Sequence, residues 1–283
     1  MSDQDRFTRD TATQPLAPGR HRGRVDPGWS VVDDAAPNGG YLLAIAARAM
    51  RAEASHPDPV SLTGHFLRPP STGEVTIEVE VIRRGRRHDT LTARLVQDGT
   101  ECVRVLATFG DLSAARGPTR VDLAPPSFPP REQCIDTTSG TAALAAAGAV
   151  PDFPIQRRFD HRQPPDLAGW AVGRPAGRGE MGGYVRFADA ADDDPMDTLG
   201  LLVVADCFAP AVFNAGDISA RWVPTIELTV QVRARPAPGY LAARFTTQAI
   251  TNGYLEEDGQ IWDAESNLVA LSRQLALMPR EPS

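Results

Sequence analysis

An internal repeat is the feature that most constrains how this chain of 283 residues can fold. Two stretches, residues 28–110 and 181–278, follow one plan: a strand, a loop, a helix and then four strands. The helices are predicted over residues 41–53 and 194–213, where apolar residues recur at helical spacing or fill every side. Each unit is therefore expected to be a curved antiparallel sheet that wraps one helix, and it is too small to be very stable alone.

Alternating apolar residues between turn signals predict the strands. Val75, Ile77 and Val79 take every second position in one of them, as Ile226 and Leu228 do in another. The first unit is expected to be a helix followed by an antiparallel meander. The predicted strands cover residues 28–33, 60–69, 73–84, 90–97, 101–110, 181–188, 222–235, 240–249, 253–263 and 267–278.

The stretch between the units is rich in Pro, Gly and Ala and predicts a long connection with one short helix. We expect it to pack partly through Phe153, Ile155 and Trp170. The predicted organisation is thus an N-terminal unit over 1–110, a linker over 111–179 and a C-terminal unit over 180–283. Two such units can pair edge to edge and share one core, which predicts an α+β fold of the double-hotdog type.

The predicted helix over 194–213 contains a carboxylate where an apolar residue would be expected. Asp194 can cap it, Pro195 suits its first turn, and Asp197 adds charge near the positive end of its dipole. Asp206 follows a run of apolar residues, and a charge in such surroundings costs several kcal/mol unless it is paired or hydrogen-bonded. Asp206 is therefore either a functional group or a helix-end residue that faces solvent or makes a structural hydrogen bond.

The start of the first predicted helix is a second candidate site. Asn38 is a good cap, and Gly39 and Gly40 leave backbone N–H groups open at the positive end of a buried helix. These groups could bind a carbonyl oxygen or an anion. The alternative is a tight entry turn that needs glycine.

Composition and charge exclude several classes of protein. The net charge of −7 argues against general nucleic-acid binding, and no apolar run is long enough for a membrane span. Residues 1–14 lack the apolar core of a signal peptide and are expected to be a frayed tail. Cys102, Cys134 and Cys207 form no disulfide framework or zinc pattern, and the five histidines have no metal spacing. We expect a cytoplasmic protein without metal or cofactor.

Several segments together resemble the acyl-CoA thioesterase II family of double-hotdog enzymes. The likeness extends over about residues 29–278 and fails mainly in the linker. The segments are HFLRP (65–69), FDHR (159–162), ADCFAPAVF (205–213), PTIELTV (224–230) and VALSRQLALM (269–278).

The resemblance implies that an Asp, a Thr and a Gln hold the hydrolytic water, at Asp206, Thr225 and Gln274. The chain departs from the family's enterobacterial-type pattern near two of them. Glu-Leu-Thr follows Thr225-Ile226 in place of an Asp-His pair, and Leu-Ala follows Gln274 in place of an acidic residue and glycine. The first departure bears on substrate range more than on the chemistry.

The three residue types suit thioester hydrolysis, which needs an activated nucleophile and donors for the developing oxyanion. Asp206 could deprotonate a water, the Thr225 hydroxyl can donate or accept, and the Gln274 amide does both. Taken singly, Gln274 is also explained as a core amide that makes its hydrogen bonds within the protein, and Thr225 as an ordinary strand residue. The repeat places the counterpart of Gln274 near Ala107 or Thr108 and that of Asp206 near Gly39, so one working site is expected.

Other chemistries have weaker support in the sequence. No Gly-x-Ser-x-Gly motif occurs, and Cys207 would need the distant His161 to act as a nucleophile, so a neutral packed cysteine is the better interpretation. His65 could touch substrate from a sheet face or be structural. Arg86, in an Arg-rich turn, could contact the CoA phosphates or lie on a solvated hairpin.

The sequence thus predicts an acyl-CoA thioesterase that works by Asp-activated water. An enoyl-CoA hydratase or dehydratase of the hotdog class is an alternative, although no histidine is obvious beside the acidic residue. A non-catalytic acyl-CoA-binding protein is a third. Hotdog edges and outer sheet faces commonly associate, so a homo-oligomer is compatible with the prediction.

Overall fold

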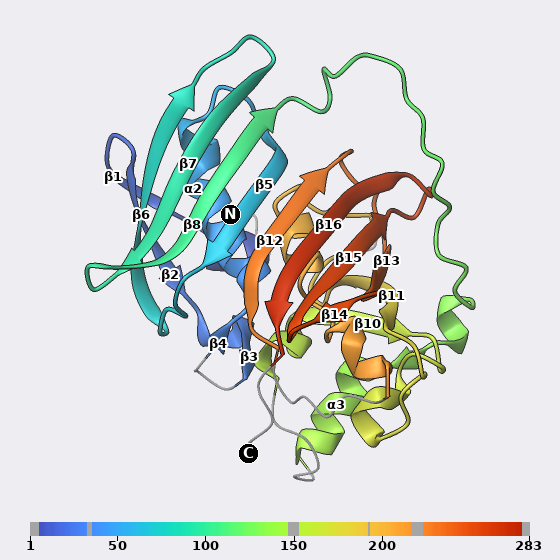
Figure 1. The fold of residues 1–283 in the computed structure, drawn as a ribbon. Helices are drawn as coiled ribbons and strands as arrows, with labels where there is room; N and C mark the ends of the chain where they lie inside the picture. Colours follow the sequence, from blue (N-terminus) through green and yellow to red (C-terminus); the bar gives the residue numbers. More distant parts are fainter. Residues whose placement is uncertain (1–5, 33–35, 147–152, 192, 217–222, 279–283) are drawn as a thin grey trace.

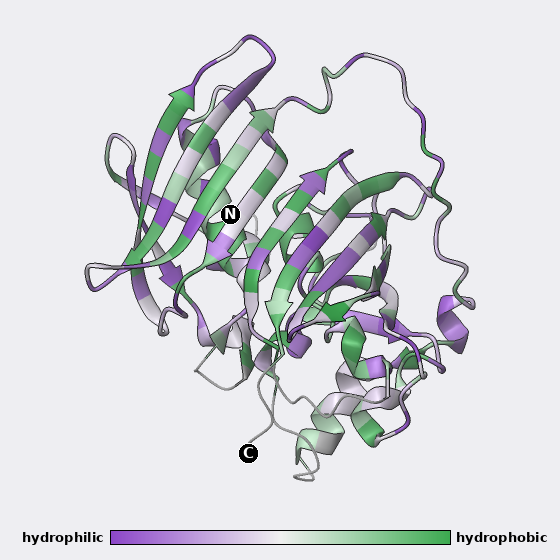
Figure 2. Ribbon diagram, viewed as in Figure 1, coloured by the Kyte–Doolittle hydropathy of each residue, from purple (hydrophilic) through white to green (hydrophobic). Residues whose placement is uncertain are grey.

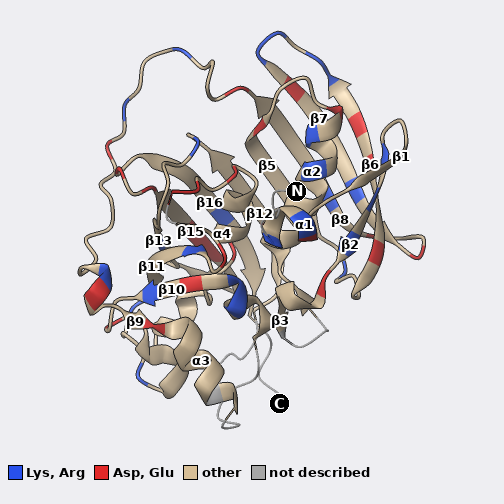
Figure 3. Ribbon diagram, turned by 180° about the vertical axis from the view of Figure 1, so that it is seen from behind, with Lys and Arg blue, Asp and Glu red and all other residues tan. Residues whose placement is uncertain are grey.

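The computed structural model describes residues 6–32, 36–146, 153–191, 193–216 and 223–278, apart from the side chains of Val32 and Leu144. Two curved half-sheets join edge to edge into one 14-stranded antiparallel sheet (Figure 1). Helices α2 (Gly39–Glu53) and α4 (Gly200–Val204) cover one face of this sheet, and Figure 3 shows them in front of the strands. None of the described helices is long and apolar enough to cross a membrane.

The N-terminal half contains the first repeat. Its helices are α1 (Arg6–Asp10) and α2 (Gly39–Glu53), with a 3₁₀ turn at Pro27–Trp29. Its strands are β1 (Gln14–Ala17), β2 (Arg20–Val25), β3 (Ser30–Val32), β4 (Ala36–Pro37), β5 (Asp58–Phe66), β6 (Gly73–Arg83), β7 (His88–Gln97) and β8 (Thr100–Gly110).

The C-terminal half contains the second repeat. Its helices are α3 (Thr137–Ala146) and α4 (Gly200–Val204), with 3₁₀ turns at Arg131–Gln133, Pro154–Arg158, Gly169–Val172 and Ala211–Asn214. Its strands are β9 (Ile135–Asp136), β10 (Phe159–Gln163), β11 (Glu180–Phe187), β12 (Thr225–Val232), β13 (Leu241–Thr246), β14 (Ile250–Thr251), β15 (Tyr254–Trp262) and β16 (Leu268–Leu277).

The strand order of the two halves is equivalent but is not a simple meander. The order is β2-β6-β7-β8-β5 in the first half and β11-β13-β15-β16-β12 in the second. The expected meander is confirmed for β6, β7 and β8, whereas β5 lies beside β8 instead of β6. This exchange places β5 and β12 at the seam, where they pair with each other.

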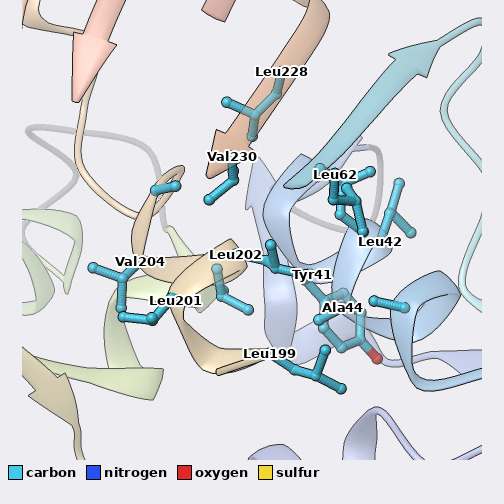
Figure 4. Packing of buried hydrophobic residues seen from close by; sticks show 14 of the residues in the cluster. Tyr41, Leu42, Ala44, Leu62, Leu199, Leu201, Leu202, Val204, Leu228 and Val230 are labelled. Carbon is cyan, nitrogen blue, oxygen red and sulfur yellow. The ribbon is translucent and has the colours of Figure 1, made fainter. Parts of the chain in front are cut away.

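The seam supports the double-hotdog prediction and explains why two small units are stable together. The Thr63 and Thr229 hydroxyls hydrogen-bond across it at 2.8 Å, at positions that pair in the β5–β12 register. Apolar residues alternate with polar ones along the strands (Figure 2), so the inner face of the sheet is mainly apolar. Buried residues of both halves, including α2 and α4, form one continuous cluster (Figure 4).

Helix α2 crosses the inner face of the first half and is buried along most of its length. It begins at Gly39, two residues before the predicted start. The Asn38 side chain accepts a hydrogen bond from the Tyr41 N–H at 2.8 Å, which confirms the predicted cap. Because the cap fixes the first turn, the following N–H groups point out of the helix end.

The single helix predicted over 194–213 is wrong. Helix α4 covers only Gly200–Val204, and a 3₁₀ turn follows after Pro210. On the N-terminal side, Asp197 accepts from the Leu199 N–H and binds Arg51 of α2 at 2.7 and 2.8 Å, which holds the entering chain outside the helix. On the C-terminal side, the Asp206 N–H bonds the Val203 carbonyl, the tightened i−3 pattern of a helix end.

The N-terminal segment also differs from the prediction. Residues 6–10 form α1 and are not frayed, because Phe7 is buried and stacks on Phe187. The sheet of this half begins with β1 and β2, which pair with each other, and β2 pairs with β6. Of the predicted strand at 28–33, only Ser30–Val32 is a strand, and it pairs with β4 in a separate two-stranded sheet. Strand β2 was missed because its inward positions include His21 and Gly23, so apolar alternation is absent.

The segment over 111–179 is not only a connection. Its residues form the predicted short helix as α3, and β10 pairs with β11 and extends the second half-sheet. Ile155 is buried, and Trp170 packs against the core, as predicted. Trp222, the predicted first residue of a strand, lies outside the described residues. The division into 1–110, 111–179 and 180–283 stays a prediction.

Candidate active site

Asp206 lies where the end of α4 meets the start of α2. Its Oδ2 accepts hydrogen bonds from the Gly40 N–H at 2.9 Å and from the Asn38 side-chain amide at 3.0 Å. The same Asn38 amide binds the Asp206 backbone carbonyl at 2.6 Å. Asn38 therefore has two roles, since its oxygen caps α2 while its nitrogen fixes the carboxylate.

The two glycines at the start of α2 permit this contact. A Cβ at Gly40 would lie 2.3 Å from the Leu202 carbonyl oxygen, and one at Gly39 would lie 3.0 Å from Asp206 Oδ2. The anion at this helix start is thus the carboxylate of Asp206 itself, supplied by the other half of the molecule. A Cβ at Gly39 would also lie 2.8 Å from the ring of Phe66, which places Phe66 beside the site.

The electrostatic setting makes Asp206 an unusually strong base for a carboxylate. Burial raises its pKa to about 6, against the opposing effect of the Gly40 and Gly39 N–H groups. Asp206 lies deep among protein atoms yet keeps part of its surface exposed. Within the described residues, its Oδ1 accepts no hydrogen bond of ordinary geometry. One carboxylate oxygen is therefore fixed and the other is open.

Gln274 and Thr225 lie on the inner face of two neighbouring strands. Gln274 of β16 pairs with Leu228 of β12, and Ala276, two residues further on, pairs with Thr225. A bulge at Ile226 keeps Thr225 on the same face as Leu228. Gln274 and Thr225 are therefore diagonal neighbours.

Gln274 is buried, with 6% of the residue exposed, and its side-chain amide makes no hydrogen bond within the described residues. Thr225 likewise makes no side-chain hydrogen bond there. No direct hydrogen bond joins either of them to Asp206 in that part of the chain. Their polar atoms are therefore available to a ligand or a water.

The strand register gives an internal comparison for these positions. If Thr63 and Thr229 are taken as equivalent positions of the two halves, the bulge at Val60 of β5 corresponds to the bulge at Ile226 of β12. The partner of Leu62 is then Ala107, which matches Gln274, the partner of Leu228. In the same match, Thr225 corresponds to Pro59. The first half therefore has neither the amide nor the hydroxyl, in agreement with the sequence comparison.

A second buried carboxylate, Glu257, was missed by the sequence analysis. It lies on β15 directly opposite Gln274, and its Oε2 accepts from the Ala211 N–H at 2.5 Å. Burial, together with the negative charge of Asp206, raises its pKa to about 7, against the opposing effect of the Ala211 N–H. Its inward position in the pattern of β15, between Leu255 and Gly259, was the available signal in the sequence.

A Cys–His contact forms next to Asp206, although the sequence offered no near partner for Cys207. His161 Nε2 lies 3.4 Å from Cys207 Sγ, and its Nδ1 lies 3.0 Å from Gln156 Oε1. Burial lowers the pKa of His161 to about 4 and raises that of Cys207 well above its usual range. Both groups are therefore neutral at physiological pH, and this neutrality fits the predicted packed cysteine.

Two predicted contact residues lie away from Asp206. His65 is exposed on the outer face of the sheet, where it pairs with Glu227 and Arg104. Arg86 is exposed in the β6–β7 turn, which Asp89 ties to Ser55 just beyond the C-terminus of α2. Since α2 has 15 residues and rises about 1.5 Å per residue, about 22 Å separates this turn from the N-terminus of the helix.

Comparison with known proteins covers nearly the whole chain. Family models for the N-terminal and the C-terminal domain of acyl-CoA thioesterases match residues 25–110 and 125–278. An uncharacterized protein of Mycobacterium tuberculosis is 27% identical over 315 aligned residues, which cover 97% of this chain and 99% of the relative.

Solved structures agree with the family models. A protein of Thermobifida fusca named a thioesterase II is 31% identical, with a TM-score of 0.85 and coverage of 99% of this chain and 100% of that chain. An Alicyclobacillus acidocaldarius protein with a hot dog fold has a TM-score of 0.80 at 20% identity, with coverage of 99% and 100%, and shows the fold alone. The chain therefore belongs to the acyl-CoA thioesterase family of double-hotdog thioester hydrolases.

Proposed function

We propose that this chain hydrolyses acyl-CoA thioesters, with Asp206 as the base that activates a water molecule. The observation that carries the proposal is the anchored carboxylate, with Oδ2 held by Gly40 and Asn38 and Oδ1 open. A pKa of about 6 keeps Asp206 ionised at neutral pH and makes it more basic than an ordinary aspartate. Such a group can take a proton from water at the pH where the enzyme works.

Gln274 and Thr225 complete the proposed site by positioning the water. The amide and the hydroxyl each offer both a donor and an acceptor, and neither is bound to protein within the described residues. Direct attack by water requires no covalent intermediate. This agrees with the neutral, buried state of Cys207, the nearest thiol to Asp206 in the sequence.

A hotdog hydratase or dehydratase is the alternative that the geometry supports less. It would need a histidine free to exchange a proton near Asp206. His161 contacts Cys207, the residue after Asp206, but both of its ring nitrogens are engaged by Gln156 and Cys207, and burial disfavours its protonation. A non-catalytic acyl-CoA binder is the remaining alternative.

The test is a panel of acyl-CoAs of graded chain length with detection of free thiol. The proposal expects thiol release by the wild type for at least one chain length and its loss in Asp206→Asn. Loss of an enoyl-CoA chromophore without thiol release would instead indicate a hydratase. Binding of acyl-CoA without turnover of any thioester would indicate a carrier. The expected cytoplasmic location and homo-oligomer stay predictions.

A further inference from the structure

A rung here means three residues that pair with one another across neighbouring strands. One rung on the inner face of the second half contains polar residues, whereas the equivalent rung of the first half is wholly apolar. Three paired residues, Leu62, Ala107 and Leu91, form the rung across β5, β8 and β7. Their equivalents are Leu228, Gln274 and Glu257 across β12, β16 and β15. Leu91 is completely buried, and Glu257 is 8% exposed. A buried leucine position therefore holds a carboxyl group in the half that contains Asp206.

The surroundings of Glu257 favour the protonated carboxylic acid. No described residue forms an ion pair with it, and its one hydrogen bond is the Ala211 N–H to Oε2. The titratable groups that act on it are Asp206, from the segment after α4, and Glu256 on its own strand, and both are acidic. Arg273 and Arg244 on the flanking strands bind Asp258 and Glu180 instead.

The open oxygen of Glu257 lies beside the open amide of Gln274. These two residues are directly paired, so their Cβ atoms are about 5 Å apart on one face. Oε2 is occupied as an acceptor, which leaves Oε1 to carry the proton and to donate. Figure 3 shows the acidic segment of β15 close to α4.

We propose that Glu257 is a further catalytic residue of this site and acts as a neutral carboxylic acid that donates a hydrogen bond from Oε1 to the thioester oxygen. The inference rests on the proposed thioesterase function and deepens it. Carboxylic acids kept neutral by an apolar site are known to serve as oxyanion donors. A donor of this kind is strongest toward the transition state, where the oxygen becomes negative.

The proposed step balances without any further reactant. Asp206 takes a proton from water as the water oxygen bonds to the thioester carbon, and the C=O electron pair moves to the oxygen that Glu257 binds. The electron pair on that oxygen then re-forms the C=O bond as the C–S bond breaks and its electrons go to sulfur. The proton held by Asp206 passes to the thiolate, which gives the free acid and the thiol. Glu257 keeps its proton throughout, so its part is electrostatic.

The experiment compares Glu257→Gln with Glu257→Leu in steady-state hydrolysis of the acyl-CoA panel from pH 5.5 to 9. Gln keeps a donor of similar size, whereas Leu restores the residue found in the first half. We expect Glu257→Leu to lower kcat by about 100-fold with little change in KM, because a lost oxyanion donor costs about that much. If Glu257 must be protonated, kcat of the wild type should fall as the pH rises through about 7. We expect Glu257→Gln to keep kcat within about 10-fold and to lack this alkaline fall.

Glu256→Gln is the matched control, since Glu256 is the next residue on the same strand and points to the other face. It should keep the alkaline fall of the wild-type pH profile, displaced slightly toward acid because the charge of Glu256 raises the pKa of Glu257. Thermal unfolding of each variant checks the fold. Difference infrared spectra in the Asp206→Asn background should show a protonated-carboxyl band at pH 6 that Glu257→Gln removes.

Three results would overturn the proposal. They are a Glu257→Leu variant with kcat within twofold of the wild type, a Glu257→Gln variant as impaired as Glu257→Leu, and absence of the infrared band. Failure of the wild type to release thiol from every acyl-CoA is a different result, because it would overturn the proposed function itself and the role of Glu257 with it.

Discussion

The two halves of this molecule share a strand order, a seam position and a bulge, yet they differ at one rung, a row of paired residues on the inner face of the sheet. In the first half, Leu62, Ala107 and Leu91 make that rung part of the core. In the second, Gln274 and Glu257 place polar groups at the equivalent buried positions. One backbone plan thus supports an apolar core in one copy and a polar site in the other.

The comparison also shows that neither half forms the site alone. The second half supplies Asp206, and the first half supplies the Gly40 N–H and the Asn38 amide that fix it. A buried carboxylate needs such partners, because an unpaired charge costs several kcal/mol. The first half therefore keeps a helix start suited to an anion, and the second half provides the anion.

The largest effect is expected for Asp206→Asn, which removes the charge that only the second half carries and keeps the shape of the side chain. We expect kcat to fall by about 1,000-fold or more, since an amide cannot take the water proton. Free-thiol release from acyl-CoA measures the effect. Asp166→Asn, which changes an exposed carboxylate paired with Arg178, is the control. Unchanged turnover in Asp206→Asn would remove Asp206 from the mechanism.

Glu257→Leu makes the second half resemble the first and should change how stability depends on pH. Folding raises the pKa of Glu257 from 4.5 to about 7, so the folded state binds this proton more tightly than the unfolded state does. The stability from this group is complete below pH 4.5 and is lost as the pH rises through about 7.

Relative to the wild type, Glu257→Leu should therefore gain up to about 3 kcal/mol in free energy of unfolding between pH 5 and pH 8.5. Urea denaturation at the two pH values measures the gain, with Glu256→Gln as the control on the same strand. A difference between Glu257→Leu and wild type that stays constant with pH would contradict a raised pKa in the folded protein.

Gln274→Ala tests the same rung by giving the second half the alanine of the first. We expect about 100-fold lower kcat, because the water loses a partner that the strand holds in place. Fold stability should change little, since the amide makes no hydrogen bond within the described residues. The reciprocal Ala107→Gln should leave kcat as it is. A fully active Gln274→Ala enzyme would mean that the amide has no part in the reaction.

Thr225→Val keeps the shape and removes the hydroxyl, as Pro59 does at the equivalent position in the first half. The smallest effect is expected here, about 10-fold in kcat, since one weak contact to the water is lost. Thr229→Val, on the same strand at the seam, is the control. An equal loss in both variants would indicate a general effect on β12 and not a role of the Thr225 hydroxyl.

The repeat and most of its strands could be predicted because alternation and turn residues are local signals. The cap at Asn38 was predictable for the same reason, and its hydrogen bond to Tyr41 confirms it. Strand β2 and helix α1 were not, because His21 and Gly23 break the apolar pattern and Phe7 is buried by a residue far along the chain. The helix over 194–213 was overestimated because apolar content alone cannot reveal that Arg51 holds Asp197 outside it.

The sequence by itself determined the duplicated plan, the family likeness and the three residues proposed to hold the water. Tertiary structure decided what surrounds them: the Gly40 N–H at Asp206, the placement of Glu257 beside Gln274, and the distance that separates Arg86 from the helix start. These depend on which strands pair at the seam and how closely α2 approaches α4. Protonation states follow from that packing, because burial and neighbouring charges, and not residue type, set the pKa of a carboxyl group.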